Sequence, residues 1–177
     1  STTEKSNNSN SRFASATSLN YSNKLPSNAY VYFNVNLMTF SFGSSVYTLE
    51  SVISSYDTIL DIPAHFDSGV DGWGDVQTIA SGAASDRTGV TQVIIPDTTL
   101  YINENAFAGC TSASLLVIGT GLKQIGNGAF KNMTSISKID YYAENCNNLE
   151  ASNEVFMNVG KVDVFNNITL TIKNTVI

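Results

Sequence analysis

The chain has 177 residues, of which 42% are hydrophobic and 14% charged, and its formal net charge is −6. This length suits one domain. The acidic balance argues against a nucleic-acid partner, because neutralising phosphates requires clustered Lys and Arg. No apolar run approaches the roughly 18 residues that a transmembrane helix needs, so no membrane span is expected.

Residues 1–27 are predicted to form a flexible polar tether. Ser1 to Arg12 are almost all small or polar, and such a segment cannot bury enough apolar surface to order itself. The segment would be either a spacer behind a lipid anchor upstream of Ser1 or a terminus with no role. The chain starts at Ser1 rather than Met, which is consistent with a mature form whose export signal lies upstream.

Residues 28–55 are predicted to form an N-terminal β cap. Aromatic and β-branched residues partly alternate over 30–37 and 39–42, a pattern that favours strands. Residues 47–53 favour a strand over a short helix. Because an exposed sheet edge invites aggregation, we expect this block to cover the open edge of the domain that follows.

An insert that begins near residue 64 holds the only histidine, His65, and an Asp- and Gly-rich segment, Asp67–Asp75. A solvent loop is expected there. Calcium binding is the alternative, although the carboxylates lack the alternate-position spacing of a known calcium loop. Trp73 either anchors a protein or glycan contact or folds back over the first repeat. A hydrolase would have to be built on His65, and no catalytic residue is predicted.

Residues 93–130 contain one pattern twice, 23 residues apart, and a fixed period of this size is typical of a solenoid. Each unit has a short strand with one buried face, a bend rich in Asn and Gly, and an Ala-Phe pair that plugs the stack. Two ladders follow the period, Ile79, Ile102 and Ile125 in one, and Val93, Leu116, Ile139 and Val162 in the other. Ala83-Ala84 and Val155-Phe156 are degenerate end copies of the Ala-Phe pair. Residues 166–177 are predicted to form a closing strand or to lead into a further domain.

Metal and cofactor sites are not predicted. Cys110 and Cys146 are 36 residues apart without CxxC spacing, so a zinc site is unsupported. Because Met133 stands one period after Cys110, a buried packing thiol is favoured over a disulfide. Gly119–Gly126 is superficially similar to a dinucleotide loop, but its third glycine comes late and the repeat explains the segment.

Outward positions of the repeated strands form the candidate partner-binding surface. If Val93, Leu116 and Ile139 point inward, the outward residues bring three apolar side chains into one strip. Contiguous exposed apolar residues mark a partner site or a covering segment, and the alternative is that the N-terminal strands lie across the strip. The candidate residues are Gln92, Ile94, Leu115, Val117, Lys138 and Asp140, with Trp73 as a separate candidate.

These patterns resemble the BspA-like class of leucine-rich repeats over residues 56–165. The matching residues of one unit are Ile95-Pro96, Ile102, Ala106-Phe107, Cys110 and Leu115, and those of the next are Ile125-Gly126, Ala129-Phe130, Met133 and Ile136. The opening unit matches at Tyr56, at the run from Ile59 to Pro63, and at Val76 and Ile79. The resemblance implies a protein on or outside the cell surface of bacteria or some parasitic protists, associated with adhesion and protein binding. No catalytic residues come with the motif.

We therefore expect a mainly β, short leucine-rich-repeat solenoid of about four units with a 23-residue period and an N-terminal β cap. Its expected role is that of a non-enzymatic, cell-surface or secreted module that binds protein or glycan and uses no cofactor. A structural spacer without a ligand is the first alternative, and a hydrolase-type accessory using His65 is the second.

Overall fold

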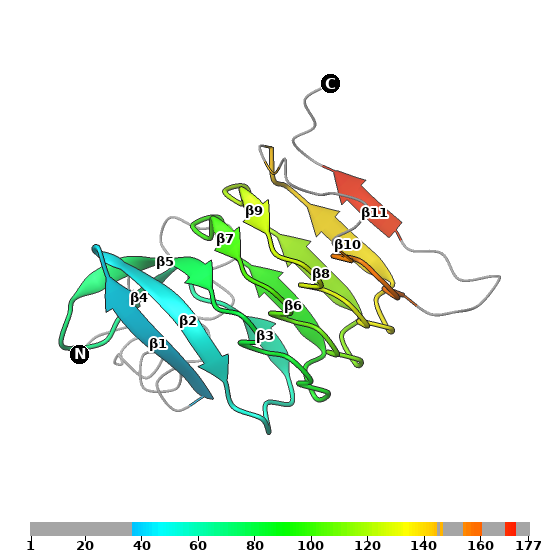
Figure 1. Ribbon diagram of the computed structural model, residues 1–177, viewed down its shortest axis with the longest axis horizontal. Coiled ribbons are helices and arrows are strands. Elements are labelled where there is room, and N and C mark those ends of the chain that lie inside the picture. The colour runs from blue at the N-terminus through cyan, green and yellow to red at the C-terminus, as the bar shows by residue number, and fades with distance from the viewer. Residues whose placement is uncertain (1–36, 145, 147–153, 161–168, 173–177) are drawn as a thin grey trace.

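The computed structural model describes residues 37–144, 146, 154–160 and 169–172, and every element assigned there is a β-strand (Figure 1). The strands are β1 (Met38–Gly43), β2 (Val46–Val52), β3 (Ile59–Asp61), β4 (His65–Asp67), β5 (Trp73–Ile79), β6 (Gln92–Ile95), β7 (Tyr101–Ile102), β8 (Leu115–Ile118), β9 (Gln124–Ile125), β10 (Lys138–Tyr141) and β11 (Thr169–Ile172). The described part of the chain holds no helix that is long and apolar enough to cross a membrane.

One sheet contains the repeated strands in the order β11-β10-β8-β6-β3, and all its neighbours run parallel. Val93 pairs with Leu116 and Leu116 with Ile139, as the 23-residue ladder predicts. The last step of that prediction is wrong, because Leu170 of β11 pairs with Ile139. Val162 itself lies outside the described residues. A strand is observed within the predicted segment 166–177, at β11, beside β10.

The second sheet has the order β1-β2-β5-β7-β9, with β4 paired to β5. The long N-terminal strands β1, β2 and β5 lead in this sheet to the two-residue strands β7 and β9. Its parallel pairs Ile79–Ile102 and Ile102–Ile125 confirm the other predicted ladder. β1 and β2 form an antiparallel hairpin, and β2 continues the sheet beside β5. The strands expected at 39–42 and 47–53 are thus observed as β1 and β2, whereas residues 30–36 lie outside the described part.

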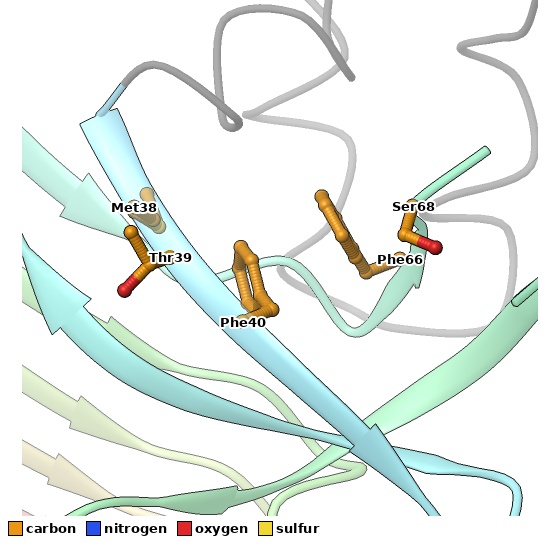
Figure 2. Close-up of a pocket in the computed structure, with 5 residues that line it drawn as sticks. All are labelled: Met38, Thr39, Phe40, Phe66 and Ser68. Atoms are coloured by element: carbon orange, nitrogen blue, oxygen red, sulfur yellow. The ribbon is translucent and has the colours of Figure 1, made fainter. Parts of the chain in front are cut away.

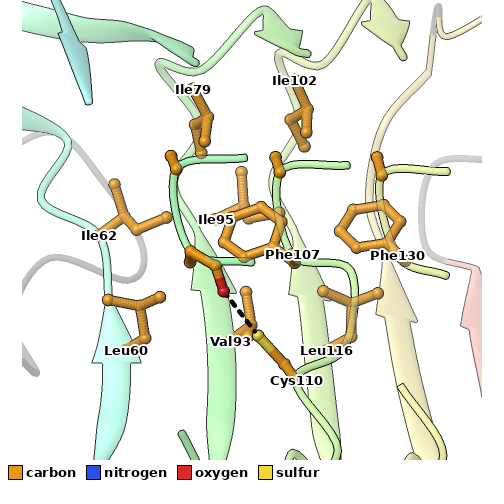
Figure 3. Close-up of a cluster of buried hydrophobic side chains, with 14 of the residues drawn as sticks. Leu60, Ile62, Ile79, Val93, Ile95, Ile102, Phe107, Cys110, Leu116 and Phe130 are labelled. Carbon is orange, nitrogen blue, oxygen red and sulfur yellow. Dashed lines mark hydrogen bonds between the residues drawn. The ribbon is translucent and has the colours of Figure 1, made fainter. Parts of the chain in front are cut away.

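The hydrophobic core lies between the two sheets and repeats from coil to coil (Figure 3). Leu60, Val93 and Leu116 are fully buried in successive strands. The Ala-Phe plug is also confirmed: the rings of Phe107 and Phe130 are fully buried and stacked, with centroids 5.7 Å apart. Phe156 continues this stack at 5.5 Å from Phe130. Burying one such side chain stabilises the fold by roughly 1.5–3 kcal/mol.

A third backbone ladder joins the turns that carry the Ala-Phe pairs. Ala84 N donates to Ala106 O, Phe107 N to Ala129 O, and Phe130 N to Val155 O. Positive φ angles recur at two positions of each turn, where Gly and Asx residues dominate because they tolerate this conformation. The first position is occupied by Gly82, Asn105, Gly128 and Glu154, and the second by Asp86, Gly109, Asn132 and Asn158.

Close stacking of coils accounts for the glycines that are superficially similar to a dinucleotide loop. A Cβ on Gly119 would lie 2.6 Å from the carbonyl carbon of Pro96, and one on Gly126 would lie 2.6 Å from the Glu104 nitrogen. Both distances are shorter than side-chain carbons adopt. These glycines therefore let one coil lie directly on the preceding coil.

Cys110 is a buried packing residue, as predicted. Its side chain is fully buried, and its Sγ donates to the Ala84 carbonyl oxygen at 3.2 Å (Figure 3). Met133, one coil later, is equally buried. Burial raises the pKa of the Cys110 thiol to about 11, and neither Cys110 nor Cys146 forms a disulfide.

Candidate interaction surface

The outward side chains of β3, β6, β8 and β10 form two parallel rows, which together we call the outer face. These four strands lie side by side in Figure 1. The first row is Ile59, Gln92, Leu115 and Lys138, and the second row is Asp61, Ile94, Val117 and Asp140. Six of these eight residues are the candidates that the sequence predicts, and the strand register brings all six together.

The apolar strip lies in the middle of the outer face. Ile94 and Leu115 are partly exposed, whereas Val117 is only 6% exposed. Val117 is more buried than predicted, although it pairs with the same two strands as the partly exposed Leu115. The alternative that N-terminal strands cover the strip is wrong for residues 38–52, because β1 and β2 extend the other sheet.

Charged residues flank the strip in the second row. Asp61 stands at one end, beside Ile94, and Asp140 at the other, beside Val117. Asp140 Oδ2 is 3.6 Å from the Lys138 ammonium, while its Oδ1 is buried and has no hydrogen-bond partner. The outer face thus combines an apolar centre with carboxylates on both sides.

Asp61 is the most perturbed acid of the described residues. It is 6% exposed, and neither of its carboxylate oxygens has a hydrogen-bond partner. Burial raises the pKa of Asp61 to about 8, because removing a carboxylate from water disfavours its charged form. Burial, with a contribution from the Asp61 charge, also raises the pKa of Tyr56 to about 12. The Tyr56 hydroxyl donates to the Ile59 carbonyl oxygen at 2.8 Å.

Asp61 and Ile59 belong to the outer face but were missed as candidates. The insert between residues 64 and 75 lengthens the first coil, so a fixed 23-residue step does not reach β3. Aligning Ile62-Pro63 with Ile95-Pro96 would have found them, because that alignment places Ile59 beside Gln92 and Asp61 beside Ile94, as observed.

His65 pairs with an acid on the neighbouring strand of the insert. Its Nδ1 is 2.8 Å from Asp75 Oδ1, and the two residues are register partners in the antiparallel β4–β5 pair. His65 Nε2 is buried and has no hydrogen-bond partner. The pair links the two strands of the insert.

The Asp67–Asp75 segment forms the turn between β4 and β5 and the start of β5. Asp67 Oδ1 accepts from the Gly69 nitrogen at 2.8 Å, and the Ser68 hydroxyl donates to Asp71 Oδ2 at 3.2 Å. Trp73 is 40% exposed and lies on β5. Because β5 belongs to the other sheet, the structure does not bring Trp73 to the outer face.

An open hollow of about 260 Å³ lies at β1 and β4, lined by Met38, Thr39, Phe40, Phe66 and Ser68 (Figure 2). The rings of Phe40 and Phe66 stack with centroids 4.1 Å apart. Tyr47 packs edge-on against Phe66 at 5.0 Å. The hollow is an aromatic feature of the N-terminal hairpin and is separate from the outer face.

Residues 75–176 match the model of the BspA-type leucine-rich repeat region, which contains six copies of the repeat. The chain belongs to this BspA-type leucine-rich repeat family. The resemblance predicted from the repeated Ile-Pro and Ala-Phe pairs is therefore confirmed. None of the curated proteins compared with this chain matches it.

Two solved structures are similar to this BspA-type chain. A leucine-rich cell surface protein from Faecalibacterium prausnitzii A2-165 is 21% identical over 77% of this chain and 41% of its own, with a TM-score of 0.49. A leucine-rich repeat protein from Bacteroides ovatus ATCC 8483 is 19% identical over 61% of this chain and 33% of its own, with a TM-score of 0.37. The present chain thus spans less than half of either protein.

Proposed function

We propose that this BspA-type chain is a non-enzymatic interaction module that binds a protein or glycan outside the cell through its outer face. The observation that carries the proposal is the register of β3, β6, β8 and β10, which gathers apolar and charged side chains into two contiguous rows. A mixed apolar and polar patch of this kind suits recognition of another molecule.

Differences between the two sides of the strands support a binding role. The inward positions in β6 and β8 are fully buried apolar residues, which coil stacking requires. Stacking makes no comparable demand on the outward positions, where Gln92, Leu115 and Lys138 differ in chemistry along one row. Their composition is therefore open to selection by a partner.

An extracellular or cell-surface location is part of the proposal. It is supported by the location that the BspA-like resemblance implies and by a polar surface supplied mainly by Ser, Thr and Asn. Adhesion is the corresponding role.

A binding screen against extracellular-matrix proteins and glycans tests the proposal. Leu115→Glu is the probe variant, because Leu115 is partly exposed and central in the first row. Val117 is unsuitable, since at 6% exposure its replacement would threaten folding. Val70→Lys is the matched control, because Val70 is an apolar residue that is 89% exposed in the β4–β5 turn.

We expect wild type and the Val70→Lys variant to hold the same ligand and a folded Leu115→Glu variant to bind it at least about tenfold more weakly. Equal binding by the two variants would show that the ligand binds elsewhere than on the outer face. If wild type holds no ligand, the chain acts as a spacer.

We further propose that His65 has no catalytic role. Its Nδ1 is engaged by Asp75, and its Nε2 has almost no exposed surface from which to reach a substrate. A His65→Ala variant assayed against ester and glycoside substrates should match wild type. Turnover by wild type that the variant loses would support the hydrolase alternative.

A further inference from the structure

We propose that one face of the β4–β5 hairpin binds a neutral saccharide, whose sugar ring stacks on Trp73 and whose hydroxyl groups donate to Asp67 and Asp75. This is a second site, because the hairpin belongs to a different sheet from the outer face (Figure 1). The inference goes beyond the proposed function and does not depend on it. It follows from the strand register of the hairpin and from the exposure of the side chains that this register brings together.

The strand register places four side chains on one side of the hairpin, which we call the hairpin face. Asp67 pairs with Trp73, and His65 pairs with Asp75. Directly paired residues of two antiparallel strands point to the same side, and so do residues two positions apart on one strand. The 2.8 Å contact between His65 Nδ1 and Asp75 Oδ1 agrees with this arrangement. Trp73 therefore has one acid across the ladder and another two residues along its own strand.

The hairpin face is accessible to solvent. Trp73 is 40% exposed, the Asp75 side chain is 53% exposed, and Asp67 is partly exposed. Each acid uses its Oδ1 within the hairpin, Asp67 with the Gly69 nitrogen and Asp75 with His65. Within the described part of the chain, neither Oδ2 has a hydrogen-bond partner, and neither is among the buried polar atoms that lack one. Two hydrogen-bond acceptors thus flank the exposed indole ring.

The opposite side of the hairpin is anchored in an aromatic cluster, which holds the hairpin face in place. Phe66 is 3% exposed and packs edge-on against Tyr47, with ring centroids 5.0 Å apart. The Tyr47 hydroxyl donates to the Gly72 carbonyl oxygen at 2.6 Å and accepts from the Ser68 nitrogen at 3.1 Å. These two bonds fix both ends of the turn. A site fixed in advance loses little conformational freedom on binding, which favours affinity.

The chemistry of the hairpin face fits a sugar ring. In a pyranose with equatorial hydroxyls, C–H groups cover both sides of the ring and the hydroxyls radiate from its edge. The C–H groups carry partial positive charge and complement the negative face of an aromatic ring, while the hydroxyls donate to carboxylates beside it. Residues 64–79 contain three Asp and no Lys or Arg. A neutral sugar is therefore favoured over an acidic one.

The size of the hairpin face favours a sugar over a protein partner. Its two register pairs span roughly 7 Å along the strands and roughly 5 Å across them, which is comparable to one sugar ring. A specific protein interface buries roughly 800 Å² on each partner around an apolar centre. Of the four side chains on the hairpin face, only that of Trp73 is a large apolar one.

The test titrates the full chain with cellohexaose and chitohexaose and follows tryptophan fluorescence. Both are neutral β-1,4-linked oligosaccharides with equatorial ring substituents. Trp73 is the only tryptophan of the chain, so this signal reports on the hairpin face directly. Calorimetric titration repeats the measurement with Trp73→Ala, and thermal denaturation checks that this variant folds. Phe156→Ala is the matched control, because it removes an aromatic ring that is 37% exposed and lies outside the hairpin.

We expect at least one of the two oligosaccharides to change the wild-type fluorescence saturably. Trp73→Ala should bind it at least about tenfold more weakly, whereas Phe156→Ala should bind it as wild type does. Asp75→Ala keeps the fluorescent reporter and should bind at least about threefold more weakly, because it removes one acceptor. An oligomer of β-1,4-linked glucuronic acid, which has the cellohexaose backbone with a carboxylate on each ring, should not bind.

The inference is overturned if neither oligosaccharide changes the wild-type signal, if a folded Trp73→Ala variant binds as tightly as wild type, or if the glucuronic acid oligomer binds as well as the neutral ones. If Trp73→Ala does not fold, Asp75→Ala decides. A lysine-containing peptide that changes the fluorescence while both oligosaccharides leave it unchanged would assign the hairpin face to a basic partner protein instead. The proposed function is decided separately, by the Leu115→Glu screen.

Discussion

The two faces of the β3-β6-β8-β10 sheet follow different rules although the same short strands build both. On the inward side, Val93 and Leu116 are fully buried and Ile139 is 7% exposed. On the outward side, one row holds Ile59, Gln92, Leu115 and Lys138, and the other holds Ile94 and Val117 between two acids. Stacking therefore dictates one face, because each coil must bury its apolar side against its neighbours, and does not fix the chemistry of the other.

The largest loss of stability is expected from a substitution that removes a buried aromatic ring on the inward side. Phe130→Ala removes the middle ring of the Phe107–Phe130–Phe156 stack and should lower the free energy of unfolding by about 3–5 kcal/mol. Phe156→Ala is the control, because this ring is 37% exposed and should cost roughly 1–2 kcal/mol. Urea denaturation measures both, and equal losses would contradict the distinction between a buried plug and an end residue.

On the outward side, a substitution is expected to raise the free energy of unfolding, by an amount that depends on pH. The pKa of Asp61 is raised to about 8, so the folded state retains a proton that the unfolded state releases above about pH 4. The Asp61 contribution to stability must therefore fall as pH rises from about 4 to about 8. Asp61→Asn removes this penalty and should match wild type at pH 4 but exceed it by up to a few kcal/mol at pH 9.

Thermal denaturation of wild type and Asp61→Asn across this pH range provides the measurement. An Asp61→Asn variant that is less stable than wild type at pH 9 would mean that the carboxylate has a stabilising partner.

A smaller effect is expected where coils approach most closely. Gly119→Ala places a Cβ 2.6 Å from the Pro96 backbone and should cost about 1–3 kcal/mol, because neither coil can move without disturbing its neighbours. Gly43→Ala is the control, since no atom lies within 4 Å of its added Cβ. Indistinguishable urea midpoints for the two variants would show that the coils stack less tightly than described.

The regular middle of the fold could be predicted from the sequence because its local pattern and its contacts share one period. Val93, Leu116 and Ile139 occupy the same position in successive copies, so sequence spacing alone places them in one row. The same reasoning located the Phe107–Phe130 stack and six of the eight residues of the outer face.

Prediction failed where connections change length. The β4–β5 insert hid the place of Asp61 and Ile59 beside β6, and the longer connection from β10 to β11 put Leu170 where Val162 was expected. The burial of Val117 was also missed, because the period places it beside Ile94 and Asp140 but does not determine how deeply it is buried. Strand partners separated by a connection of irregular length leave no periodic signal.

The most direct test of the two-face account compares adjacent leucines on β8. Leu116 points inward and is fully buried, whereas Leu115 points outward and is partly exposed. In urea denaturation, Leu116→Ala should lower the free energy of unfolding by about 2–5 kcal/mol, and Leu115→Ala by less than about 1 kcal/mol. Equal losses would mean that the outer face is part of the core, and would contradict its assignment as a binding surface.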